Sequence, residues 1–197
     1  MTVQTVSTSP LVKRYTLQEF WELPEPPGGG HYELIRGVLY MVPPPSGPHN
    51  NAWGELNERL CAFVIGHPGI GRVFGPRAAI WIDDDTYIEP DLMFLSADLL
   101  QKTDLGKIRT ADLVIEISSP ATAVYDRTTK ADTYLYLGVR ELWLVDTERR
   151  VIEQRVPEGR TWHIGGRFGM GAEVHSRVLQ GFVCPVSPVF AEHPLAR

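Results

Sequence analysis

The chain alternates short apolar runs with segments rich in glycine and proline, a pattern that predicts strands and helices joined by turns. Residues 112–118, DLVIEIS, are rich in β-branched side chains and precede a serine-proline pair, as a strand would before a turn. Alternation places Leu113, Ile115 and Ile117 on one face of this strand. Glu116 belongs to the other face, so it is either an ordinary solvent-facing residue or a charged group placed in a cleft.

Two further pairs of apolar runs predict β-hairpins. Residues 32–42 contain two runs that meet at Arg36 and Gly37, where glycine can supply a positive φ. Residues 77–95 contain two runs around the acidic turn at residues 83–86. The polar turn and the flanking apolar residues favour a second hairpin.

Three segments are expected to form helices. Residues 16–23 carry a capping-box pattern and should form a short helix after a frayed N-terminal tail. Residues 50–66 place apolar side chains at helical spacing, and residues 123–139 end near Gly138, a suitable residue to follow a helix. The inner face of the third helix is expected to contain Val124, Ala131, Tyr134 and Leu135.

The order strand, helix, strand from residue 112 to residue 146 implies a right-handed crossover. Residues 112–118 and 141–146 should therefore pair in parallel in one sheet. Residues 151–156, 161–164 and 173–178 are expected to be short strands around a glycine-rich turn. The fold class is therefore α/β (α+β), with a central mixed β-sheet flanked by helices and extra short strands at the C-terminus.

Composition favours one globular domain over residues 1–197, because 43% of the residues are hydrophobic and 22% are charged. The chain has no run of 18 apolar residues, and its N-terminus lacks the apolar segment of a secretory signal. We therefore expect a cytoplasmic protein without a membrane partner. Cys61 and Cys184 have no metal-ligand spacing, so free thiols are expected and a zinc site is not.

The charge balance excludes a general polyanion binder. The 19 lysines and arginines stand against 24 aspartates and glutamates, which gives a net charge of −5. Nucleic-acid binding would therefore need a local basic surface. The candidates for that surface, near the strand that carries Glu116, are Lys102, Lys107, Arg109 and Arg127.

Candidate chemistry centres on Asp91 and Glu116. Asp91 follows Pro90 within an apolar run, where alternation would group Glu89, Asp91 and Met93 on one face, and a proline there suits an edge or a bulge. If this run pairs with residues 112–118, two carboxylates meet and need a shared proton, a basic partner or a metal ion, unless both point into water. Carboxylate and backbone oxygens suit Mg²⁺ or Mn²⁺ rather than zinc, which points to phosphoryl-transfer chemistry.

Further candidates have two readings each. Lys130 could reach back over the Glu116 strand, or pair with Asp126 on a solvated helix face. Glu33 is either a further carboxylate of the site or a surface partner of Arg36. His49 could contact a phosphate, but the start of a helix is the favoured interpretation.

Taken in order, five segments resemble the Uma-two family of restriction endonucleases, a branch of the PD-(D/E)XK nuclease superfamily. The resemblance covers roughly residues 32–146. These segments are YELIRG, MVPPPSGPHN, EPDLMFLS, DLVIEISSPAT and YDRTTKADTYLYLGVRELWLVD.

The resemblance implies a restriction-endonuclease-like core with a metal-dependent nuclease site. Asp91, Glu116 and the backbone oxygen of Ile117 would bind the ion, and Glu33 would match an additional acidic residue. The superfamily places a lysine two residues after the glutamate, but this chain has Ser118 there. The role of that lysine has therefore moved to Lys130 or been lost, and the resemblance to the Uma-two branch implies that it has moved.

The leading hypothesis is a Mg²⁺-dependent DNA endonuclease, with Mn²⁺ as an alternative ion and no small-molecule cofactor. Cleavage of both strands of a duplex favours a two-fold homodimer, although the sequence leaves the oligomeric state open. The alternative is a non-catalytic scaffold or regulatory protein that retains the nuclease fold. A glycosidase with paired carboxylates is a third hypothesis, but it gives Lys130 no role.

Overall fold

The structure is a computed structural model that describes residues 12–192, so the N-terminal tail before residue 12 lies outside the described residues. Its largest sheet is mixed and has six strands, in the order β10-β9-β8-β7-β6-β3. The pairing of β7 with β8 is parallel and the other pairings are antiparallel, which confirms the predicted crossover. The strands are β3 (Gly71–Phe74), β6 (Leu92–Ser96), β7 (Leu113–Ser118), β8 (Glu141–Asp146), β9 (Val151–Glu158) and β10 (Thr161–Phe168).

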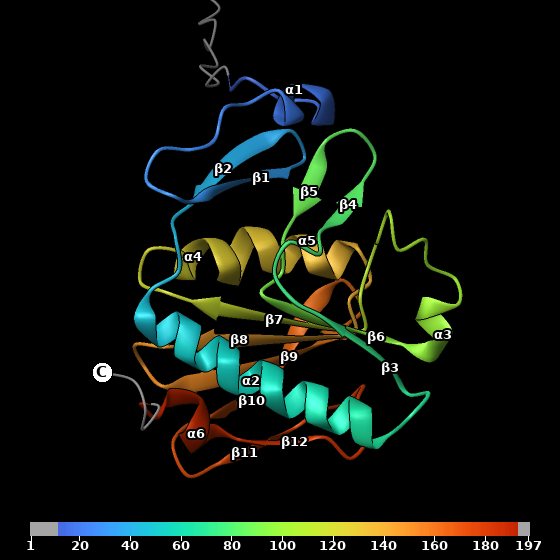
Figure 1. Cartoon of the computed structure of the whole chain (residues 1–197), viewed down its shortest axis with the longest axis vertical. Coiled ribbons are helices and arrows are strands. Elements are labelled where there is room, and N and C mark those ends of the chain that lie inside the picture. Colours follow the sequence, from blue (N-terminus) through green and yellow to red (C-terminus); the bar gives the residue numbers. More distant parts are fainter. Residues whose placement is uncertain (1–11, 193–197) are drawn as a thin grey trace, which may run out of the picture.

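Helices cover both faces of this sheet (Figure 1). On one face the long helix α2 (Gly47–Gly66) packs through Leu56 and Leu60 against β6 and β7. The short elements β11 (Glu173–His175), β12 (Val183–Pro185) and α6 (Val186–Phe190) complete that layer. The other face is covered by α4 (Ala123–Tyr125), the π-helical turn η1 (Asp126–Lys130) and α5 (Ala131–Tyr136).

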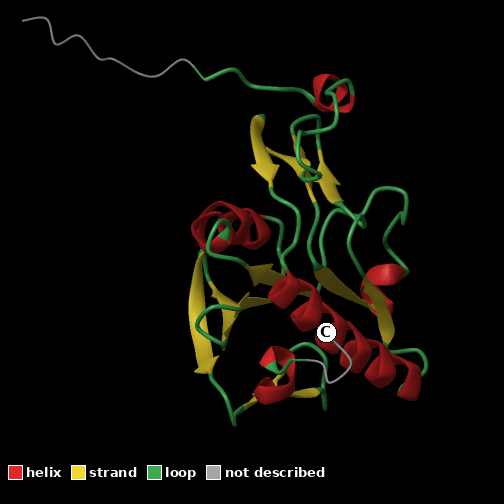
Figure 2. Ribbon diagram, turned by 60° about the vertical axis from the view of Figure 1, so that its left-hand side comes forward, coloured by secondary structure: helices red, strands yellow, loops and turns green. Residues whose placement is uncertain are grey.

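A second, four-stranded sheet lies at one end of the molecule (Figure 2). Its order is β2-β1-β5-β4, and α1 (Leu17–Trp21) packs on it. The predicted hairpin turn is confirmed, with positive φ at both Arg36 (50°) and Gly37 (76°), as a two-residue turn requires. The capping box at the start of α1 is also confirmed. The strands are β1 (His31–Ile35), β2 (Val38–Val42), β4 (Ile80–Ile82) and β5 (Thr86–Ile88); the remaining helix is α3 (Ala97–Leu100).

The fold class is as predicted, but three expectations about the extent of strands and helices are wrong. Residues 87–95 are not one strand, because β5 ends at Ile88 in the small sheet and β6 begins at Leu92 in the large one. The alternation that grouped Glu89 with Met93 therefore does not apply. The other two expectations concern α2, which begins at Gly47 rather than residue 50, and the C-terminal strands β9 and β10, which are long and extend the central sheet.

The inner face of the third predicted helix also differs from expectation. Ala131 and Tyr134 are fully buried, but Val124 is 77% exposed. The π-helical turn between α4 and α5 holds more residues per turn than an α-helix, so it rotates Val124 away from the core.

Two further observations concern the chemistry of the chain. Cys61 and Cys184 are both free thiols, as expected, and burial raises the pKa of Cys184 to about 12. Between residues 12 and 192, none of the helices combines the length and the apolar character that a membrane span needs.

Candidate active site

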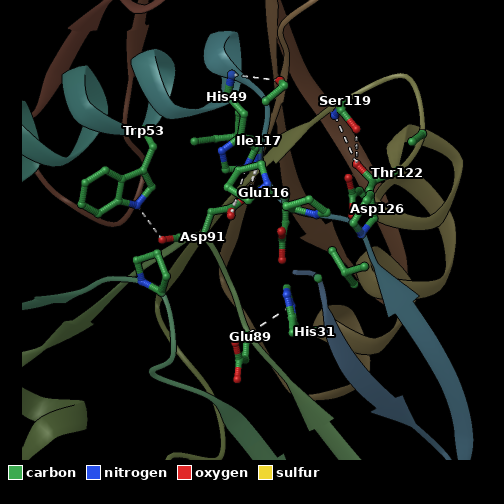
Figure 3. Close-up of a pocket in the computed structure, with 18 of the residues that line it drawn as sticks. His31, His49, Trp53, Glu89, Asp91, Glu116, Ile117, Ser119, Thr122 and Asp126 are labelled. Atoms are coloured by element: carbon green, nitrogen blue, oxygen red, sulfur yellow. Dashed lines mark hydrogen bonds and ion pairs between the residues drawn. The ribbon is translucent and has the colours of Figure 1, made fainter. Parts of the chain in front are cut away.

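A pocket of about 690 Å³ opens at the carboxyl end of β7, beside the start of α2. Four of the five predicted site residues line it: Asp91, Glu116 and Ile117, which are labelled in Figure 3, and Lys130. Glu33 lies behind this lining and contacts Lys130. The fold therefore brings all the predicted site residues to one place.

The register of the central sheet places Asp91 beside Glu116. Leu92, the first residue of β6, pairs with Ile115 in antiparallel register. Asp91, which directly precedes β6, therefore lies opposite Glu116. Asp91 Oδ2 accepts a hydrogen bond of 2.7 Å from the backbone N–H of Ile117. The chain leaves the small sheet at Pro90, where the lack of an N–H costs no ladder hydrogen bond.

Glu116 is a buried residue of the site rather than a solvent-facing one. All six residues of β7 are buried, and Glu116 is only 2% exposed. Its Oε1 lies 2.9 Å from Lys130 Nζ and also accepts a hydrogen bond from the hydroxyl of Tyr134. Burial raises the pKa of Glu116 well above its ordinary value; Lys130 opposes this shift, and the neighbouring Asp91 adds to it.

Lys130 occupies the centre of a buried charge cluster. Its Nζ lies 2.9 Å from Glu116 Oε1 and 3.1 Å from Glu33 Oε1, and it donates to the backbone oxygen of Glu89 at 3.4 Å. Burial lowers the pKa of Lys130, but the two carboxylates outweigh burial and raise it well above the ordinary value. Lys130 is thus a charged, 4% exposed residue, and its predicted alternative on a solvated helix face is wrong.

Glu33 holds this lysine from the side of the small sheet. It is fully buried and accepts hydrogen bonds from the N–H of Glu89 and the hydroxyl of Tyr125, both at 2.8 Å. The alternative role of Glu33 as a surface partner of Arg36 is therefore wrong. Burial raises the pKa of Tyr125, and the negative charge of Glu33 raises it further. This tyrosine therefore remains a hydrogen-bond donor at neutral pH.

Two residues of α2 fix the position of Asp91. His49 Nε2 lies 3.2 Å from Asp91 Oδ1, and Trp53 Nε1 donates to the Asp91 backbone oxygen at 3.1 Å. His49 also lies in the first turn of α2, where its N–H donates to the N-cap side chain of Ser46. The helix-start interpretation of His49 is therefore confirmed; its contact with a phosphate stays a prediction, and His49 lines the pocket. The spacing of four residues between His49 and Trp53 puts both on one helix face, a signal that the sequence contained.

The basic residues expected beside the cleft do not line the pocket. Arg109 lies 3.6 Å from Asp83, and Arg127 pairs with Asp146 and Glu153. Lys107 lies over the ring of Trp81, and Lys102 is exposed on the surface. Their proximity to β7 in the sequence does not place them at its carboxyl end, where the pocket lies.

The cationic residue that sequence reasoning missed is Arg77. It lines the pocket with its side chain 69% exposed, and its guanidinium lies 3.3 Å from Glu89 Oε2. Glu89 and Asp126 are further buried or nearly buried carboxylates of the lining. No periodic pattern marks Arg77, because it lies in a turn with a φ of 71°.

The oxygen atoms at the end of β7 suit a hard divalent ion. Among residues 12–192, no three His, Cys, Asp or Glu side chains are placed to hold a metal together. Asp91, Glu116 and Ile117 nevertheless all line the pocket. Two carboxylates and a backbone oxygen fit Mg²⁺, which usually keeps several waters and uses few protein ligands.

The arrangement of the sheets and helices is that of a nuclease fold. The solved structure of "a putative nuclease belonging to DUF820" from Anabaena variabilis is similar to the chain, with a TM-score of 0.70 and 22% identity. The likeness covers 89% of this chain and 97% of that one. A family model described as "Uma2: Putative restriction endonuclease" matches residues 17–187, and the chain belongs to this family. Among curated proteins, none matches it.

Proposed function

We propose that this protein is a Mg²⁺-dependent endonuclease that hydrolyses phosphodiester bonds of DNA. The observation that carries the proposal is the position of Lys130, whose ammonium lies 2.9 Å from Glu116 at the wall of the pocket. Ser118 occupies the position of the lysine in the general nuclease motif and cannot supply its positive charge. Lys130 brings this charge to the Glu116 carboxylate from a neighbouring helix. Membership of the family supports the assignment to the nucleases.

Asp91, Glu116 and the Ile117 backbone oxygen would hold the ion. When bound, Mg²⁺ polarises a phosphate oxygen and lowers the pKa of a coordinated water. The chain holds its own groups in place before any ligand arrives: His49 and the Ile117 N–H orient Asp91, while Tyr134 and Lys130 orient Glu116. Preorganisation of this kind removes reorganisation from the reaction step.

The three neighbours of Lys130 define its role. An ammonium has three N–H donors, and here Glu33, Glu116 and the backbone oxygen of Glu89 accept them. Lys130 therefore acts through its fixed positive charge, which stabilises negative charge that develops on the phosphate, and through its hold on Glu116. Glu33 in turn keeps the lysine charged and in place.

A metal titration with supercoiled plasmid tests the proposal. Mg²⁺ and Mn²⁺ should support nicking and Ca²⁺ should not, because Ca²⁺ polarises water less and accepts looser geometry. Glu116→Ala and Asp91→Ala should abolish nicking. Glu55→Ala is the matched control and should cut as the wild type does, since Glu55 lies on α2 in a partly exposed pair with Arg59 and does not line the pocket.

The outcomes separate the two functional hypotheses. Nicking that persists in excess EDTA and survives both alanine substitutions contradicts a metal site at Asp91 and Glu116. A wild type that binds DNA but cuts with none of the ions supports the non-catalytic scaffold. Sedimentation of the wild type with and without duplex DNA tests the proposed homodimer.

A further inference from the structure

A second hollow of about 350 Å³ adjoins the candidate active site. It lies between the end of α1, the segment that follows α1, and the small sheet. The two hollows share three lining residues, His31, Arg77 and Glu89. A ligand that crosses this shared border would occupy both hollows.

Aromatic residues form part of the lining of the second hollow. Trp21 remains 55% exposed although it contacts Phe20 and Tyr87, with ring centroids 5.0 and 4.8 Å away. The two neighbours meet it at steep interplanar angles of 72° and 80°, so they fix its orientation without covering it. A large, oriented and exposed indole is a stacking platform for a flat ring.

The border between the second hollow and the active-site pocket is polar, so it can form specific hydrogen bonds and ion pairs with a ligand. Arg77 is 69% exposed, which leaves its guanidinium accessible to a phosphate. Glu89 is 8% exposed and lies beside it, and its Oε2 is 3.9 Å from the buried Nε2 of His31. The Glu89 carboxylate is suited to accept a hydrogen bond from the polar edge of a nucleobase.

Electrostatic attraction alone would bind DNA to this protein only weakly. Its net charge is −5, and among the described residues that line the active-site pocket only Arg77 and Lys130 are lysine or arginine. Lys130 is already surrounded by carboxylates. Stacking, which does not depend on charge, can supply about 1–3 kcal/mol per base.

We propose that the second hollow binds an unpaired nucleobase next to the phosphate that is cut, with the base on Trp21 and the linking phosphate at Arg77. The inference rests on the proposed nuclease function. A base inside a duplex cannot reach Trp21 without leaving its stack. The preferred substrate is therefore DNA with a single-stranded segment, such as an overhang or a flap, rather than fully paired duplex.

Binding measured in EDTA tests this subsite without any need for cleavage. Fluorescence anisotropy would compare a labelled single strand, the same strand with abasic sites, and a blunt duplex. The wild type should favour the intact single strand. Trp21→Leu should weaken its binding by about 5- to 150-fold, which corresponds to the stacking energy of one base, and should leave duplex binding unchanged.

Two further variants control for folding and surface effects. Trp21→Phe retains an aromatic face and should recover most of the affinity. Tyr136→Leu removes an aromatic side chain that is 70% exposed outside both hollows, and it should bind as the wild type does. Far-UV circular dichroism and melting curves confirm that each variant is folded.

The subsite and the nuclease function fail in different ways. Equal binding of the intact strand by the wild type, Trp21→Leu and Tyr136→Leu overturns the subsite, even if the wild type nicks plasmid with Mg²⁺. A Trp21-dependent preference for single strands, without cleavage under any ion, supports the subsite and overturns the nuclease. Equal affinity of the wild type for intact and abasic strands also counts against stacking.

Discussion

The charge cluster around Lys130 predicts that two isosteric substitutions have opposite consequences for stability. Lys130 is 4% exposed and contacts Glu116 and Glu33, which are 2% and 0% exposed. Lys130→Met retains most of the volume but leaves two buried carboxylates without a counter-charge. Glu116→Gln retains both the shape and the acceptor oxygen, and leaves Lys130 paired with Glu33.

The expected magnitudes follow from this imbalance. Breaking a buried ion pair by removal of one partner costs about 3–5 kcal/mol of the free energy of unfolding, because a buried charge remains unpaired. For a protein of this size, Lys130→Met should lower Tm by roughly 6–20 °C, at about 2–4 °C per kcal/mol. Glu116→Gln relieves repulsion with Asp91, so the metal-free protein should be as stable as the wild type or more stable.

Urea denaturation and melting curves, each in EDTA and in Mg²⁺, measure both effects. Mg²⁺ at about ten times its dissociation constant should add roughly 1.4 kcal/mol to the wild type and nothing to Glu116→Gln. Lys102→Met is the matched control, because Lys102 is exposed and its replacement should change stability by less than about 0.5 kcal/mol. The reasoning is refuted if Lys130→Met is no less stable than Lys102→Met, or if Glu116→Gln loses as much stability as Lys130→Met.

Four other predictions follow from the same contacts. Lys130→Ala should remove most turnover but retain Mg²⁺ binding, as measured by calorimetry. Lys130→Arg should restore little activity, because the planar guanidinium does not replace the compact charge of an ammonium. Cleavage by Lys130→Ala at the wild-type rate would exclude a catalytic role of Lys130. Because the pKa of Glu116 is raised above its ordinary 4.5, the metal-free wild type should lose stability relative to Glu116→Gln as pH rises above about 4.5, and denaturation curves that stay parallel at all pH values would contradict this. The affinity for DNA should depend weakly on salt, so a plot of the logarithm of the binding constant against the logarithm of the salt concentration should have a slope of about −1 to −2. Arg77→Gln should reduce the magnitude of this slope by about one; a slope of roughly −5 or steeper would require a basic surface elsewhere. Glu141→Ala should lower the free energy of unfolding by about 3 kcal/mol or more and leave the Mg²⁺ response intact, since this buried carboxylate accepts five hydrogen bonds away from the pocket, and a loss below about 1 kcal/mol would refute the estimate.

Interactions between near neighbours were readable from the sequence. Three features each depend on residues only a few positions apart: the turn at Arg36 and Gly37, the capping box of α1 and the two faces of β7. Their patterns can therefore be recognised in the sequence. The parallel pairing of β7 and β8 followed from the length and the handedness of a single crossover. The resemblance to the nuclease family then indicated which charged residues belonged together.

Only the tertiary structure decided the surroundings of those charges. Glu33 and Lys130 are 97 positions apart, and nothing in either local pattern shows that both are buried and 3.1 Å from each other. The change of sheet between Ile88 and Leu92 places Asp91 beside Glu116 by a route that strand alternation did not predict. Arg77 reaches the pocket while Arg109 does not, because the path of the chain in space, rather than distance along the sequence, determines which side chains meet.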